Sequence, residues 1–556
     1  MKTKYLFTLA LASSLAFAGC EDLDTMPSGG TVTSGQKEEV AESLPERAEA
    51  GVTAIFAQFS VYAPNYTTFG DVLRHNDLGY PTVMMLTDAN GQDVVMEDNG
   101  YNWAGSSMDF SDRTYTSYEA QMVWNDMYQI IFNANNVIAT ISADTDEAQA
   151  QYFLAQGLAG RAFSYLTLAQ LYQFNYKGHE SALCVPIITN ENSNDAVLNG
   201  APRATVEAVY QQINNDLTKA IELLEKSGVQ KSRRYINLGT AYGLRARMNL
   251  AMHNYAEAAA DATKAIQATD AVPAALDKVG RPAFWSLNEA NWMWGIEIAE
   301  TDDVVSSGII NWISHNGTFN YGYCWYSGGH QINKKLYKTI PDSDARKAWW
   351  SNEKGDNPAL TPAYQKFLKD YKYVPLTSCK FSPYGGYSDA NLGSDNNAND
   401  VILMRVEEMY LIKAEGEAMA TGNTAALENF IRTYRDPEYK VPATDIQEEI
   451  LRQRRIEFWG EGLIWFDFMR LNKGIDRRGA GYPNETMIFN IPAGDNLLLW
   501  RIPEAEIQAN PALDEDDNNP VAPTPSPVED IDYLSGLSMS PYVLYDMNRG
   551  IGKLVM

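Results

Sequence analysis

The sequence predicts a mainly α-helical protein built from stacked helix pairs with one loop-rich face. Two observations lead to this prediction. Apolar residues recur at helical spacing over long segments, notably residues 147–174, 205–226, 240–266 and 401–434. Between residues 270 and 400 this periodicity fades, and Gly, Asn, Ser, Pro and aromatic residues become frequent. Because long irregular segments in a compact protein are usually functional, we expect the ligand-binding face in this second region.

The long helical segments differ in their apolar pattern. Residues 147–174 are apolar almost all round, which predicts a helix buried on most sides. Residues 205–226 have one apolar face, and Thr205 is the expected N-cap.

Residues 240–266 predict two helices that meet at a break around His253 and Asn254. Small residues follow at spacings that let antiparallel helices approach closely, as in the second helix of a tetratricopeptide repeat: Ala258, Ala262 and Ala265. Residues 401–434 repeat this pattern more loosely, with the break at Gly422 and Asn423. Helix pairs of this kind cannot bury their apolar faces alone, so we expect several to stack.

The N-terminus has the order of a bacterial lipoprotein signal. Lys2 and Lys4 precede a stretch of apolar or small residues over residues 5–18, too short to span a membrane, and the small residues Ala18 and Gly19 lie just before Cys20. We expect residues 1–19 to be the signal peptide and Cys20 to be lipidated. The alternative is an ordinary signal peptide with a chance cysteine.

Residues 20–40 are polar, acidic and Gly-rich, and they predict a flexible tether. Acids directly after Cys20, as in the sequence CEDLD, resemble the export signal that sends some lipoproteins to the outer face of the outer membrane. We expect residues 41–556 to form one unit, with an N-terminal half over 41–269 and a C-terminal half over 270–556.

Composition restricts the class of function. The net charge of −27 argues against nucleic-acid binding, which needs a basic face. Besides Cys20 there remain Cys184, Cys324 and Cys379, an odd number that does not suit a disulfide scaffold. The 32 Tyr, 19 Phe and 12 Trp favour carbohydrate or peptide binding, although most of these aromatic side chains will pack in the core. Trp124, Trp459 and Trp465 lie on patterned helices and are expected there.

Several motifs together resemble a known family. Arg161, Ala162, Tyr165 and Leu168 form an Arg-Ala-x-x-Tyr-x-x-Leu helix, residues 452–471 read RQRRIEFWGEGLIWFDFMRL, and residues 499–513 read LWRIPEAEIQANPAL. In this order behind a lipoprotein signal, they resemble the SusD/RagB family of nutrient-uptake lipoproteins. The positions that match its most specific stretch are Arg454, Arg455, Ile456, Glu457, Glu461, Gly462, Trp465, Phe466 and Asp467. The positions that depart from the family pattern are Gln453, Leu463, Ile464 and Arg501.

The resemblance implies a SusD-like fold, an α-α superhelix of tetratricopeptide-like helix pairs with a loop-rich ligand face. It implies binding without catalysis and without a cofactor. The implied place is the outer membrane, with the lipid-anchored protein facing the cell exterior above a SusC-like TonB-dependent β-barrel transporter. The implied ligands are oligosaccharides, or peptides in the RagB branch of the family.

Three carboxylates also fit another class of protein, a secreted glycoside hydrolase. Glu457 and Glu461 are four residues apart, which predicts one helix face, and Asp467 follows closely. However, Arg454 lies three residues before Glu457, and Arg470 lies three residues after Asp467. Guanidinium neighbours keep a carboxylate ionised, which is wrong for a general acid, so we expect a structural ion-pair network.

Aromatic and amide side chains in the loops are the better candidates for binding. Sugar rings stack a C–H face on Trp or Tyr, while amides and carboxylates bond to the hydroxyl groups. The predicted ligand-binding residues are Tyr101, Asn102, Trp103, Trp312, Asn320, Tyr321, Tyr323, Trp325 and Tyr326, with Asn99 beside them and Trp350 as a further candidate. The other interpretation of any of these aromatic residues is a core anchor.

Metal binding has weak support in the sequence. The five histidines lack metal-ligand spacing. Asp88, Asn90 and Asp93 carry oxygens at close spacing but lack the later Glu of a calcium loop, and residues 514–519 are acidic. Both segments are interpreted as solvated loops, with calcium as the alternative.

Overall fold

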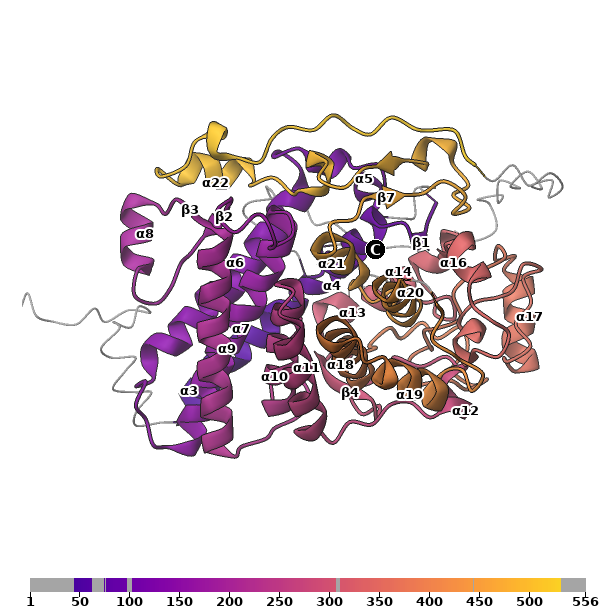
Figure 1. The fold of residues 1–556 in the computed structure, drawn as a ribbon, viewed down its shortest axis with the longest axis horizontal. Coiled ribbons are helices and arrows are strands. Elements are labelled where there is room, and N and C mark those ends of the chain that lie inside the picture. Colours follow the sequence, from indigo (N-terminus) through magenta and orange to yellow (C-terminus); the bar gives the residue numbers. More distant parts are fainter. Residues whose placement is uncertain are drawn as a thin grey trace, which may run out of the picture.

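The structure, a computed structural model, describes residues 45–62, 75, 77–97, 103–306, 311–443 and 445–531. Over these residues the chain is mainly helical, with a few short strands, which confirms the predicted fold class (Figure 1). Cys20, the signal peptide and the tether lie outside the described residues, as do Asn99, Tyr101 and Asn102. No described helix is long and apolar enough to cross a membrane.

Long helices fill one side of the molecule (Figure 1). They are α3 (Pro45–Ala57), α6 (Tyr118–Thr140), α7 (Ala148–Tyr172), α9 (Val206–Ser227), α10 (Leu238–Ala251) and α11 (Tyr255–Gln267). Helix α7 is buried along nearly its whole length and packs against α6 and α9, as its all-round apolar pattern predicts. Thr205 caps α9, since its hydroxyl accepts a hydrogen bond from the backbone N–H of Ala208 at 3.2 Å.

The expected helix pair over residues 240–266 is present as α10 and α11. The chain reverses at His253, whose φ of 61° is left-handed, and Ala258, Ala262 and Ala265 are fully buried. Helix α18 (Val406–Thr421) lies against the other side of α11. At Gly416 a Cβ would stand 2.4 Å from the carbonyl oxygen of Tyr255, so only glycine permits this approach.

The expected helix over residues 401–434 begins later than predicted. Residues Val401–Arg405 form strand β6, which pairs antiparallel with β4 (Trp292–Ile296), and helices α18 and α19 (Ala425–Tyr434) follow. The physical reason is that VILMR is an apolar run that suits a strand buried on both faces as well as a helix. The break at Gly422 is confirmed, since this residue ends α18 in a left-handed conformation.

The described strands form four two-stranded antiparallel pairs. Besides β4 and β6 they are β1 (Val94–Val95) with β5 (Gln331–Ile332), β2 (Leu183–Pro186) with β3 (Arg203–Thr205), and β7 (Ile475–Asp476) with β8 (Asn490–Ile491). Each pair joins segments far apart in sequence or closes a loop. The helices therefore carry the fold and the strands connect them.

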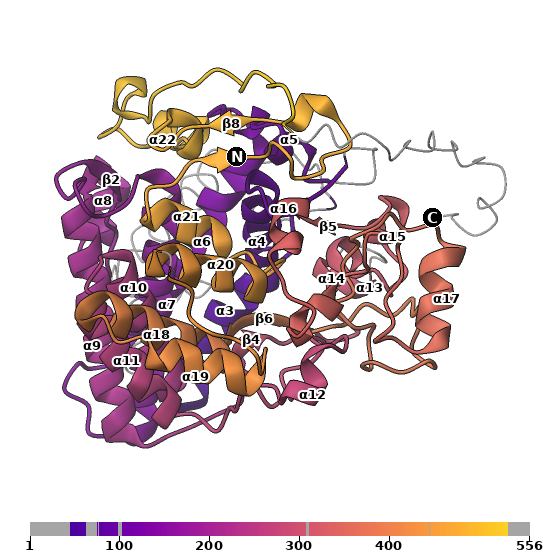
Figure 2. The same cartoon turned by 45° about the vertical axis from the view of Figure 1, so that its right-hand side comes forward.

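Short helices and loops make up residues 270–400, as expected, and they project on the other side of the molecule (Figure 2). The helices are α12 (Leu276–Val279), α13 (Asp303–Ser306), α14 (Trp312–Asn316), α15 (Tyr323–Tyr326), α16 (Lys334–Lys338) and α17 (Pro362–Asp370). A small apolar core of its own holds this region together, around Phe319, Tyr364 and Phe367.

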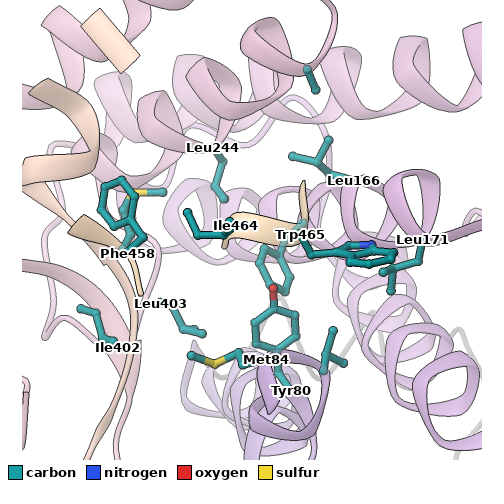
Figure 3. Packing of buried hydrophobic residues seen from close by; sticks show 14 of the residues in the cluster. Tyr80, Met84, Leu166, Leu171, Leu244, Ile402, Leu403, Phe458, Ile464 and Trp465 are labelled. Carbon is teal, nitrogen blue, oxygen red and sulfur yellow. The ribbon is translucent and has the colours of Figure 1, made fainter. Parts of the chain in front are cut away.

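The main apolar core runs through both halves of the chain. Figure 3 shows one part of it, where Trp465 and Ile464 of α21 (Ile464–Arg470) lie near Tyr80 of α4 (Tyr80–Asn90). Trp124, Trp459 and Trp465 are buried, which confirms their expected core positions. Cys184, Cys324 and Cys379 are buried free thiols, so these residues make no disulfide scaffold.

Candidate ligand-binding site

The carboxylates of the 452–471 stretch lie in a buried network of charges. Glu457, at the end of α20 (Ile446–Glu457), is fully buried and accepts hydrogen bonds from three guanidinium groups, those of Arg346, Arg405 and Arg435, at 2.6–3.1 Å. Burial alone would raise the pKa of Glu457, but Arg435 and Arg405 hold it well below its usual range.

Glu461 belongs to the same buried network. It accepts from Arg405 at 2.9 and 3.0 Å and from the ammonium group of Lys380 at 2.6 Å. Burial lowers the pKa of Lys380 to about 8. Each carboxylate oxygen of Glu457 and Glu461 thus accepts a hydrogen bond from a cation, an arrangement that holds the groups ionised and does not suit a general acid. The predicted structural ion-pair network is what these residues form.

Two details of the predicted network were wrong. Glu457 and Glu461 do not share a helix face, because α20 ends at Glu457 and Glu461 lies in the turn that follows. Arg454 pairs with Asp467 at 2.7 Å, and Arg470 joins Asp467 to the buried Glu415. The guanidinium partners of Glu457 come instead from distant segments, which spacing within one motif does not reveal.

The first candidate calcium segment is occupied by protein contacts. Asp93 forms an ion pair with Arg455 at 2.6 Å, and Asn90 bonds to Arg113 and to the carbonyl oxygen of Ser107. Burial raises the pKa of Asp88 to about 8, which disfavours the ionised form that calcium needs. The described residues contain no group of three or more His, Cys, Asp or Glu placed to hold a metal ion.

An open pocket of about 610 Å³ lies in the loop-rich half. It is lined by ten residues: Tyr321, Trp325, Tyr384, Gly385, Ala390, Asn391, Leu392, Gly393, Ser394 and Asp395. Three aromatic side chains therefore meet amide, hydroxyl and carboxylate groups around one open space. Two of the aromatic residues, Tyr321 and Trp325, were predicted from the sequence, and the structure brings them together.

The aromatic wall of the pocket stands on the small apolar core. Trp325 packs against Phe367 and Tyr371, with ring centroids 5.2 and 4.0 Å apart, while its other side remains partly exposed. Tyr321 meets Trp325 edge to face at 5.7 Å, and its hydroxyl lies 3.3 Å from that of Tyr326, which is 45% exposed. The rings are thus held in place before any ligand arrives, so binding costs little side-chain entropy.

Two loops are joined to form the pocket. The backbone N–H of Tyr321 donates to the carbonyl oxygen of Ser394 at 2.9 Å, and that of Gly393 donates to Phe319 at 2.9 Å. The buried amide of Asn320 donates to Asn397, whose own amide donates to the carbonyl oxygen of Tyr321. Asn320 therefore does not reach the pocket surface: as a candidate ligand contact it is corrected to a residue that positions the loop.

Two predicted tryptophans lie in the interior. Trp312 is 3% exposed and packs edge to face on Phe381 at 4.9 Å. Trp350 is equally buried and meets Trp459 at 5.6 Å. Both are corrected from ligand platforms to core anchors. The reason is that Gly and Asn around them mark the turns between short elements, while the ring itself fills the space beneath.

Tyr323 and Trp103 belong to a separate cluster. Tyr323 is buried, its hydroxyl forms a hydrogen bond with His75 Nδ1, and its ring stacks on His315 at 4.9 Å. Trp103 is partly buried, with its ring 4.7 Å from His75 and 5.9 Å from Tyr323. Burial lowers the pKa of His315 to about 4, so this histidine stays neutral at neutral pH. Tyr323 points into this cluster, whereas Trp325, on the same short helix, faces the pocket.

Sequence reasoning missed four residues of the site. Tyr384, Asn391 and Asp395 line the pocket, and Tyr371, 42% exposed, packs on Trp325 at its edge. The three lining residues belong to the segment FSPYGGYSDANLGSDNN over residues 381–397, which has the same mixture of Tyr, Gly and Asn that singled out residues 311–331. That compositional signal could have found them.

The sequence matches two protein families in consecutive segments. Residues 79–250 match a family described as starch-binding and associating with the outer membrane, and residues 315–521 match the SusD family. The chain belongs to the SusD family. The two matches include helices α6, α7 and α9, the buried charge network and the pocket.

Known proteins similar to this chain include one sequence relative and several solved structures with the same fold. A SusD-like protein of Formosa agariphila is 24% identical over 396 residues, which cover 64% of this chain and 73% of that protein. The crystal structure of a SusD-like carbohydrate-binding protein from Bacteroides vulgatus superposes with a TM-score of 0.68 at 23% identity, covering 86% of this chain and 98% of that one. Surface glycan-binding protein A from Bacteroides thetaiotaomicron, in complex with laminarihexaose, gives 0.57 at 17%, covering 85% and 99%.

Proposed function

We propose that this protein captures oligosaccharides at the cell surface, in the pocket lined by Tyr321, Trp325 and Tyr384. The observation that carries the proposal is the combination of rigid aromatic rings with amide, hydroxyl and carboxylate groups around one open space. A sugar ring needs this pair of surfaces, an apolar face to stack on and acceptors for its hydroxyl groups. The SusD-like carbohydrate-binding relative and the glycan complex of the second solved relative support the same ligand class.

Binding rather than turnover follows from the position of the acids. The three carboxylates that suggested a hydrolase, those of Glu457, Glu461 and Asp467, lie inside the buried ion-pair network. The pocket, by contrast, is lined by a single carboxylate, that of Asp395. Glycoside hydrolysis needs two carboxyl groups on opposite sides of the scissile bond. Purified protein is therefore expected to retain a glycan without shortening it.

Affinity electrophoresis tests the proposal. The chain from residue 21 onward is run through gels that contain one polysaccharide each, together with Tyr321→Ala, Trp325→Ala and the control Phe132→Ala. Phe132 is an exposed aromatic residue of α6, on the helical side of the molecule. We expect at least one glycan to retard the wild type and the control but not the two pocket variants. If no glycan retards the wild type, while an immobilised peptide mixture does, the ligand is a peptide.

We further propose that Cys20 carries a lipid anchor and that the protein delivers its ligand to a SusC-like TonB-dependent transporter in the outer membrane. Family membership and the family description of association with the outer membrane support this step. Metabolic labelling with palmitate tests the anchor, since Cys20→Ser should abolish the label. Protease treatment of intact cells tests the outward orientation, and co-purification with a β-barrel protein tests the partner.

A further inference from the structure

The charges around the pocket have one sign. Of the ten described residues that line it, Asp395 alone is charged, and none is a lysine or an arginine. The Asp395 side chain is exposed and forms no hydrogen bond or ion pair with any residue that the structure describes. Asp395 therefore offers a carboxylate with all its acceptor positions free, at the edge of an aromatic platform.

Charged residues next to those that line the pocket include further acids, and two of the lysines are paired with acids. Glu300 accepts the hydroxyl hydrogen bond of Tyr384 at 3.0 Å, and Asp389 accepts that of Thr361 at 2.5 Å. The nearby lysines of α17, Lys366 and Lys369, form surface ion pairs with acids of their own region. The net charge of the whole chain, −27, has the same sign as the carboxylate of Asp395.

We propose that the pocket selects uncharged glycans against anionic ones and that Asp395 is the specificity-determining residue. This inference rests on the proposed function of the same pocket. A carboxylate accepts hydrogen bonds from two neighbouring hydroxyl groups of a neutral sugar, and such charge-assisted bonds are stronger than those between neutral groups. Tyr321 and Trp325 supply the stacking surface beside it.

Anionic glycans are expected to bind more weakly for two reasons. A sulfate or uronate group offers acceptors where Asp395 needs donors. The ligand charge also approaches a like charge, and none of the described residues that line the pocket is a cation. At a separation of 4 Å in water this repulsion lowers affinity about fivefold for each such contact at low salt. Aromatic stacking is nearly the same for both classes, so the carboxylate decides between them.

Binding to two matched groups of polysaccharides tests the inference. The chain from residue 21 onward is run against neutral glycans (laminarin, starch, galactomannan) and anionic ones (alginate, chondroitin sulfate). The variants are Asp395→Asn, Asp395→Lys and the control Glu191→Gln. Glu191 is an exposed acid next to α8 (Ser193–Asn199), at the opposite end of the molecule from α17 in both views (Figures 1 and 2).

The wild type should bind a neutral glycan more tightly than any of the anionic ones. Asp395→Asn should weaken neutral binding about fivefold, because a charged acceptor becomes a neutral one. Asp395→Lys should bind the neutral glycan more weakly than Asp395→Asn does, or not at all. The same variant should be measurably retarded in gels that contain an anionic polysaccharide. Glu191→Gln removes the same charge from the whole protein and should behave as the wild type.

Three results would overturn the inference. Wild-type binding to an anionic glycan as tight as to any neutral one refutes the selection and leaves the proposed capture of glycans intact. Equal affinity of Asp395→Asn and Glu191→Gln for the neutral glycan refutes only the role of Asp395 as the specificity-determining residue. Retention on none of the gels refutes the proposed function, and the inference fails with it.

Discussion

Replacing Glu457 by glutamine removes the central anion of the buried network. Its two oxygens accept four hydrogen bonds from Arg346, Arg405 and Arg435, and all four side chains are essentially inaccessible to solvent. The amide nitrogen of Gln would face guanidinium groups that also donate. The three guanidinium groups would keep only their other carboxylate partners, Asp344, Glu407 and Glu461, so one buried positive charge would no longer be balanced. The substitution should therefore destabilise the folded protein from its interior.

The magnitude follows from the contacts. Two of the four charge-assisted bonds are lost outright, at about 1.5–3 kcal/mol each, and breaking a buried ion pair typically costs about 3–5 kcal/mol. We therefore expect Glu457→Gln to lower the free energy of unfolding by about 4 kcal/mol. For a chain of this length the unfolding entropy is roughly 1 kcal/mol per kelvin, so the melting temperature should fall by about 4 °C.

Thermal unfolding followed by circular dichroism at pH 7 measures this effect. The matched control is Glu448→Gln on the same helix, whose ion pair with Lys473 lies at the surface and should be worth less than about 1 kcal/mol. An equal melting temperature for Glu457→Gln and the control would refute the reasoning. So would loss of glycan binding by Glu457→Gln at full stability, since that would place this carboxylate in a ligand site.

Three further predictions concern stability and binding. Burial raises the pKa of Asp126 to about 7, and its second carboxylate oxygen has no partner among the described residues. Folding therefore favours the protonated form, and the free energy of unfolding should fall as the pH rises from about 4 to 7. Asp126→Asn should raise the melting temperature by about 2–4 °C at pH 8 but leave it unchanged at pH 4. Asn320→Ala should weaken glycan binding by detaching the Tyr321 loop, whereas Tyr118→Ala, at an exposed site on α6, should not; equal affinities in a titration of both variants would contradict the positioning role. Tyr371→Ala should lower affinity severalfold by releasing one side of Trp325, and an unchanged dissociation constant would show that the ring is held without it.

Sequence reasoning succeeded where the signal is local. Helices α7, α9, α10 and α11 follow from apolar periodicity, and Thr205 caps the helix that it was expected to cap. It failed at Val401–Arg405, because a short apolar run fits a buried strand and a helix equally well and the choice depends on the partner strand β4.

The site was predicted only in part, for a similar reason. Composition identified the aromatic, Gly-rich loops but not which rings face outward. Trp312 and Trp325 are thirteen residues apart in the same kind of sequence, yet one fills the main core and the other lines the pocket. The difference comes from the small core around Phe367 and from the bonds between Asn320 and Asn397, both of which join segments distant in sequence.

The most direct measurement is a crystal structure of the chain from residue 21 onward with an oligosaccharide cut from a polysaccharide that it retains. The account predicts one sugar ring against Trp325 or Tyr321, with a hydroxyl pair bonded to the carboxylate of Asp395. A sugar bound elsewhere, for example at the cluster of Trp103 and His75, with the pocket empty, would contradict it.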